Sequence, residues 1–70
     1  MERTAVRSRD LAIIGYDAGK LTLEVAFRSG GVYCYDQVPE KIYLELMKAS
    51  SHGTFFNQRI KDKFPSRKIR

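Results

Sequence analysis

The sequence has 70 residues, of which 43% are apolar, so it suits one small globular domain and not a disordered chain. No apolar run approaches the roughly 20 residues that cross a bilayer, and the first residues lack the apolar stretch of a signal peptide. We therefore expect a single domain over residues 1–70, with its core over residues 6–65, a cytoplasmic location and no membrane contact.

The cysteine and histidine content limits the chemistry of the chain. Cys34 is the only cysteine and His52 the only histidine. An intrachain disulfide is therefore impossible, and so is a zinc site made of cysteines and histidines from one chain. We expect neither a metal nor another cofactor.

The positive charge is concentrated at the carboxyl end. The net charge is +5, and residues 1–58 hold as many acidic as basic side chains, so residues 59–70 carry the whole excess. Clustered positive charge attracts RNA, DNA and other polyanions without encoding a sequence preference. The alternative is that this end, with a flexible tail over residues 66–70, is solvated and only keeps the protein soluble.

Three segments in the first half have the pattern of β-strands. Residues 21–28 alternate apolar and polar side chains, so one face of this strand is apolar. Residues 11–16 are apolar on both faces, and residues 32–35 form a third short segment. The segments between them, residues 17–20 and 29–31, contain glycine and suit tight turns. We therefore expect a three-stranded antiparallel meander.

Two helices are expected after the strands. Pro39 suits the first position of a helix, and an apolar stripe continues it to Ser50. Thr54 suits the N-cap of a second, shorter helix, which Pro65 prevents from continuing. The expected fold class is therefore α+β, with the three-stranded meander followed by two short helices packed on one face.

The loop between the second and third strands decides where Tyr33 and Tyr35 point. Directly opposed residues of antiparallel strands share a face of the sheet. A two-residue loop sends both tyrosines to the uncovered face, beside Arg28, where they would form a stacking platform for unpaired bases. A three-residue loop buries both rings under the helices. The sequence leaves both alternatives open.

Several short motifs follow one another in a fixed order along the chain. They are Gly15-Tyr16-Asp17, the alternation of residues 21–27, Gly31-Val32-Tyr33-Cys34-Tyr35, Val38-Pro39, residues 49–53, and Phe56-Asn57 with Ile60. Together they resemble the KTSC domain family, from about Val6 to Pro65. That family is named after a module at the carboxyl end of some lysyl-tRNA synthetases, and it includes short bacterial and phage proteins. The resemblance implies RNA binding, through that fusion to a tRNA ligase.

The start of the second helix is a candidate anion site, because unpaired amides and the helix dipole attract negative charge there. The residues assigned to this site are Ser50, Ser51, Gly53, Thr54 and Asn57. The alternative is purely local. In that case Thr54 caps the helix, Gly53 ends the preceding one, and Asn57 ties the turn.

The remaining motifs are interpreted as structural, and not as catalytic or nucleotide-binding. Ser51 and His52 are sequence neighbours, which seldom orient as nucleophile and base, so we expect no enzyme activity. Residues 29–31 are rich in glycine but lead into a strand, so they form a hairpin turn and not a nucleotide loop. Cys34 lies in a strand between two tyrosines and is interpreted as a packing residue.

The expected function is that of a non-catalytic module that binds RNA, or single-stranded DNA, through its basic end and tyrosine face. The residues assigned to this contact are Arg28, Tyr33, Tyr35, Arg59, Lys61, Lys63, Arg67 and Lys68. At helical spacing Lys61 points away from Arg59 and Lys63, so a recognition helix that reads a DNA groove is not expected. Two alternatives are a protein-interaction module, as a homodimer or with a phage or host partner, and a binder of small phosphorylated ligands.

Overall fold

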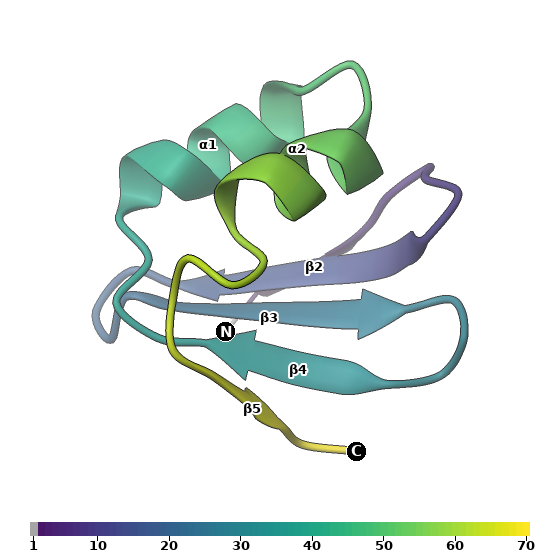
Figure 1. The fold of residues 1–70 in the computed structure, drawn as a ribbon. Helices are drawn as coiled ribbons and strands as arrows, with labels where there is room; N and C mark the ends of the chain where they lie inside the picture. Colours follow the sequence, from purple (N-terminus) through teal and green to yellow (C-terminus); the bar gives the residue numbers. More distant parts are fainter. Residues whose placement is uncertain (1) are drawn as a thin grey trace.

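The computed structural model describes residues 2–70, which fold into one antiparallel sheet with two helices on one of its faces (Figure 1). The strands lie in the order β1-β2-β3-β4-β5. In chain order the elements are β1 (Glu2–Ala5), β2 (Leu11–Asp17), β3 (Thr22–Phe27), β4 (Val32–Tyr35), α1 (Glu40–Lys48), α2 (His52–Arg59) and β5 (Ser66–Lys68). The α+β class and the two helices are confirmed, whereas the sheet has one more strand at each edge than the expected meander.

Both outer strands lack the apolar pattern by which a strand is recognised in a sequence. β1 is polar and pairs with β2, with Thr4 opposite Ile14. β5 has the sequence Ser-Arg-Lys and pairs with β4, with Lys68 opposite Tyr33. The expected flexible tail is therefore a strand, extended by a hydrogen bond of 2.7 Å from Ile69 N to the Val32 carbonyl. Backbone hydrogen bonds hold both edges, and these are independent of side-chain type.

A β-bulge explains why β2 is apolar on both faces. The register shifts between Leu11 and Ile13, because a bulge adds one residue to one strand. Leu11 and Ile14, which are three residues apart, are consequently both buried under the helices. Ile13 lies on the opposite face and remains 38% exposed.

The helices begin close to the expected positions but with a different cap. Ser51 is the N-cap of α2, and its Oγ accepts a hydrogen bond of 3.2 Å from Thr54 N. The expected N-cap, Thr54, therefore lies inside the first turn, as does Gly53. Ser51 has the extended backbone that an N-cap residue adopts and a hydroxyl that reaches the third helical residue.

The core lies between the sheet and the two helices. Its fully buried side chains are Leu11, Ile14, Leu23, Val25, Val38, Leu46 and Ile60. At one end of the core, the ring of Tyr16 stacks on that of Tyr43, with centroids 4.6 Å apart. The Tyr16 hydroxyl donates a hydrogen bond of 2.5 Å to the carbonyl of Val38, which ties the segment before α1 to the sheet.

The loop between β3 and β4 has three residues, so both tyrosines face the helices. Phe27 N donates to the Gly31 carbonyl at 2.8 Å, which leaves residues 28–30 as the loop. Tyr33 then lies opposite Val25 and Tyr35 opposite Leu23. The alternative of a tyrosine platform on the uncovered face is wrong, because an odd loop length keeps the tyrosines on the face of the apolar row.

Candidate functional site

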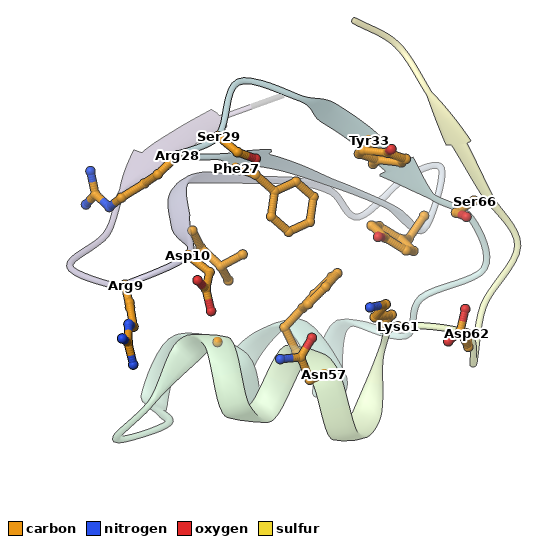
Figure 2. A pocket seen from close by; sticks show the side chains of 14 residues that line it. Arg9, Asp10, Phe27, Arg28, Ser29, Tyr33, Asn57, Lys61, Asp62 and Ser66 are labelled. Carbon is orange, nitrogen blue, oxygen red and sulfur yellow. The ribbon is translucent and has the colours of Figure 1, made fainter.

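A pocket of about 750 Å³ opens between α2 and the β3–β4 hairpin (Figure 2). Four aromatic side chains form its walls, three from the sheet and one from α2: Phe27, Tyr33, Tyr35 and Phe56. A pocket of this size is in the range that takes a small organic ligand or one unit of a polymer. We call it the aromatic pocket.

The aromatic side chains of the walls are joined to one another by edge-to-face contacts. Phe27 meets Tyr33 with centroids 5.6 Å apart and an interplanar angle of 81°, and it meets Phe56 at 5.4 Å and 71°. Tyr35 meets Phe56 at 5.3 Å and 79°. This geometry is the one that the ring quadrupoles favour, so sheet and helix present one continuous apolar wall.

The hydroxyl of Tyr35 is a hydrogen-bond donor that the fold leaves unused. Tyr35 is only 5% exposed, and none of the side-chain hydrogen bonds among residues 2–70 includes it. Burial raises the pKa of Tyr35, and the charges of Tyr33 and Asp62 raise it further, so the hydroxyl keeps its proton at neutral pH. Because Tyr35 lines the aromatic pocket, a molecule in the pocket can accept a hydrogen bond from this hydroxyl.

Polar side chains lie at both ends of the aromatic pocket. Figure 2 shows Lys61, Asp62 and Ser66 at one end and Asp10 at the other, with Asn57 projecting from α2 between them. Lys61 and Asp62 come from the turn that follows α2, and Ser66 begins β5. The site thus combines an apolar wall with polar side chains, some positively and some negatively charged, that can form hydrogen bonds.

Arg28 supports the fold at this site. Its Nε donates to the Ser8 carbonyl at 2.6 Å and its Nη2 to the Val6 carbonyl at 3.1 Å. Figure 2 shows its guanidinium turned away from the aromatic pocket, which the side chain borders with its stem. The expected place of Arg28 beside the tyrosines on an uncovered face is therefore wrong.

The basic residues of the carboxyl end are divided among three surfaces. Arg59 lies 3.9 Å from Glu45 Oε1 and over the ring of Phe55, toward α1. Arg67 lies opposite Cys34, on the uncovered face of the sheet, and 3.6 Å from Asp36 Oδ1.

Two lysines of the same segment lie on the side of the aromatic pocket. Lys61 lines it, and Lys68 shares a face of the sheet with Tyr33 because the two residues are directly opposed. Lys63 is exposed in the turn after α2 and does not line the pocket. The carboxyl end therefore does not form one continuous basic surface, because a β-strand sends successive side chains to opposite faces.

The residues of the expected anion site do not all lie together in the structure. Ser50, Ser51, Gly53 and Thr54 border a smaller hollow, whereas Asn57 borders the aromatic pocket. Ser51 Oγ, which caps the helix, is also 3.0 Å from Thr54 Oγ1.

A carboxylate lies next to this helix start. A Cβ at Gly53 would be 3.3 Å from Asp10 Oδ2, so the acidic side chain is in close contact with the first turn of α2. Asp10 therefore supplies the negative charge that the dipole of the helix favours. The ring of His52 is also used locally, because its Nδ1 donates to the Leu46 carbonyl at 2.8 Å.

No pattern in the sequence places Asp10, Asp62 or Ser66 in a site. Phe27 is on β3 and Phe56 is on α2, and the pocket that they line forms only when these two elements pack together. One signal was available for Asp62, since it is the only acidic residue in the basic segment 59–70. Its backbone is also left-handed, with φ of 61°, which is uncommon outside glycine.

No group of three or more His, Cys, Asp or Glu side chains among residues 2–70 is arranged to hold a metal ion. None of the helices described there has the length and apolar character needed to cross a membrane. The fold and the site define a small α+β domain with an open aromatic pocket.

Comparison with known proteins places this domain in a family. The model of the KTSC domain matches residues 7–64, and the chain belongs to the KTSC domain family. A crystal structure of a KTSC domain protein from Yersinia pestis superposes with a TM-score of 0.96 at 43% identity, covering 99% of this chain and 97% of that one.

Two relatives were found by sequence. An uncharacterized protein of Stutzerimonas stutzeri is 43% identical over 58 residues, which are 83% of this chain and 82% of the relative. A protein of Tsukamurella paurometabola is 34% identical over 59 residues, which are 84% of this chain and 88% of the relative. The chain thus shares its fold with the Yersinia pestis protein and resembles two further bacterial proteins in sequence.

Proposed function

We propose that this protein is a non-catalytic module that binds single-stranded RNA in the cytoplasm. The aromatic pocket, flanked by Lys61 and Lys68, is the observation that carries the proposal. Unpaired bases stack on aromatic side chains, and each such contact contributes about 1–3 kcal/mol. Tyr33 is half-buried at the pocket, so part of its ring is available for stacking.

The charges around the aromatic pocket support a polyanionic ligand. Within residues 2–70, the ion pairs join Arg3 to Glu24, Arg59 to Glu45 and Arg67 to Asp36. Lys61 and Lys68 are in none of these pairs, so their ammonium groups are available to the phosphates of a strand that enters the pocket. The proposed contact therefore uses only part of the basic segment.

Binding of a short RNA at two salt concentrations tests this proposal. Fluorescence anisotropy with a labelled octamer should show an affinity that falls as salt rises from 50 to 200 mM, because bound phosphates release counterions. Lys61→Gln and Lys68→Gln should each weaken binding by about threefold, which is the order expected for one phosphate contact. Arg59→Gln and Arg67→Gln remove the same charge elsewhere and serve as controls. Absent or salt-independent binding, or equal losses in all four variants, would contradict the proposal.

The uncovered face of the sheet favours a second candidate, association with another copy of this chain. Ala5, Ile13, Ala26 and Val32 are opposed in successive strands and form an apolar row across this face, which Ile69 extends. The Arg3–Glu24 and Arg67–Asp36 pairs keep the surroundings of the row electroneutral, so two copies would not repel each other.

Sedimentation tests this second candidate. A molecular mass that rises with concentration, and that Ile13→Ser returns to the monomer value, would support association through the uncovered face. A monomer at all concentrations would contradict it.

A further inference from the structure

The aromatic pocket contains one donor and one acceptor that the fold does not use. The donor is the hydroxyl of Tyr35, a residue that is only 5% exposed. The acceptor is the carboxylate of Asp62, which takes part in none of the side-chain hydrogen bonds or ion pairs found among residues 2–70. Both residues line the aromatic pocket, Tyr35 from β4 and Asp62 from the turn that follows α2.

The turn that carries Asp62 is fixed by backbone hydrogen bonds. Lys61 N donates to the Phe56 carbonyl at 2.9 Å, and Lys63 N donates to the Ile60 carbonyl at 3.0 Å. Between them, Asp62 is held at φ of 61°, a left-handed conformation that aspartate and asparagine adopt more readily than other residues with a side chain. The turn therefore places an exposed carboxylate at the edge of the aromatic pocket.

We propose that the aromatic pocket holds one unstacked guanine base, with Asp62 and Tyr35 on its Watson–Crick edge. This inference rests on the proposed function and names the base that the site selects. A carboxylate with two free oxygens suits two adjacent N–H donors. Among the four RNA bases, guanine alone presents such a pair, N1–H and the 2-amino group, next to a carbonyl oxygen.

The remaining groups of the pocket fit the same base. The Tyr35 hydroxyl donates to O6 of guanine, and Lys61 beside it is a second donor for the same oxygen or for N7. The ring of Tyr33, which is only partly buried at the pocket, provides the apolar surface against which a flat base stacks. Uracil offers one N–H on this edge, and adenine and cytosine offer an amino group next to an acceptor nitrogen that would face the carboxylate.

A set of RNA octamers that differ at one position tests the inference. The probes are an oligouridine and its derivatives with one central guanosine, inosine or adenosine, together with GMP and UMP as free nucleotides. We expect the guanosine octamer to bind at least tenfold more tightly than oligouridine, and the adenosine octamer to resemble oligouridine. Inosine, which lacks the 2-amino group, should lie between them. The guanosine preference should persist from 50 to 200 mM salt, since it arises from base contacts and not from phosphates.

Two variants locate the preference at the proposed groups. Asp62→Asn keeps a side chain that tolerates the left-handed backbone and removes one acceptor, and Tyr35→Phe keeps the ring and removes the donor. Both should reduce the guanosine preference to less than threefold without weakening the binding of oligouridine. Asp36→Asn removes a carboxylate on the uncovered face, beside Arg67, and should keep the preference. Amide spectra of all variants report whether they are folded.

The outcomes separate this inference from the proposed function. Equal, salt-dependent binding of all octamers would overturn the guanine pocket and leave RNA binding intact. If the protein binds GMP but none of the octamers, the pocket is a site for free guanine nucleotides, and the proposed binding of an RNA strand is contradicted. If folded protein binds none of the probes, both proposals fail.

Discussion

Arg28 at the end of β3 is joined to Ser8 in the loop before β2 by a hydrogen bond of 2.6 Å from Nε to the Ser8 carbonyl. The same guanidinium reaches the Val6 carbonyl at 3.1 Å, and Arg28 N donates to the Asp10 carbonyl at 2.9 Å. One residue of the hairpin thus holds the loop that places Asp10 against the first turn of α2. The wall of the aromatic pocket at this end depends on that loop.

Arg28→Gln should therefore lower stability, although the residue was expected to serve binding. Loss of two hydrogen bonds from an exposed charged group to backbone carbonyls should reduce the free energy of unfolding by about 1 kcal/mol, as measured by urea denaturation. Lys20→Gln, in the exposed turn between β2 and β3, removes the same charge and should have little effect. Equal stability of the two variants would show that the loop is held by other contacts.

Removal of residues 66–70 should destabilise the domain. The deletion takes away β5 and the hydrogen bond from Ile69 N to the Val32 carbonyl, and it exposes the edge of β4 to water. Because net contributions of backbone hydrogen bonds are about 1 kcal/mol each, we expect a loss of about 2 kcal/mol in urea denaturation.

The thiol of Cys34, which is buried, should at the same time become more reactive toward a maleimide. Burial raises the pKa of Cys34 in the intact protein, which disfavours the reactive thiolate. The variant Lys68→Gln keeps β5 and removes only a positive charge, so it controls for the charge that the deletion also removes. Unchanged stability and thiol reactivity in the deletion would indicate a solvated tail.

Stability should fall in alkaline solution because two tyrosines are buried. Burial raises the pKa of Tyr16 and that of Tyr35 above the ordinary value of 10.0. The unfolded chain therefore loses these protons at a lower pH than the folded one, so their contribution is complete below about pH 10 and is lost as the pH rises further.

Melting temperatures of wild type and Tyr16→Phe between pH 8 and 11 test this effect. The variant should be less stable at pH 8, since the Val38 carbonyl loses a donor, and should show a shallower decline above pH 10. Parallel curves for the two proteins would be inconsistent with a buried, protonated Tyr16.

Ser51 and not Thr54 should control the stability of α2. Ser51 Oγ accepts the hydrogen bond from Thr54 N, so Ser51→Ala leaves that amide without its partner and should cost about 1 kcal/mol. The neighbouring exposed Ser50 forms no cap, and Ser50→Ala should change the free energy of unfolding by less than half of that. A larger effect of Thr54→Ala than of Ser51→Ala would place the cap where the sequence pattern first put it.

Elements with a regular side-chain pattern could be predicted from the sequence alone. The alternation along β3 predicts that Leu23 and Val25 are buried, and both are fully buried. The second helix ends at Arg59 and not at Pro65 as expected, because the chain turns at residues 60–63. The apolar stripe and the early proline predict α1, which is present over Glu40–Lys48. These features are local, because the period of apolar residues and the restrictions of proline act within a few residues.

The edges of the sheet and the residues that make up the site, in contrast, follow from contacts between distant parts of the chain. β1 and β5 are held by backbone pairing with strands distant in the sequence, which leaves no side-chain pattern to detect. The face of Tyr33 and Tyr35 depended on one residue more or less in a loop, and local composition does not set that number. Asp62 and Tyr35 are 27 positions apart in the sequence and meet at one pocket because the turn after α2 lies over β4, an arrangement that arises when the helices pack on the sheet.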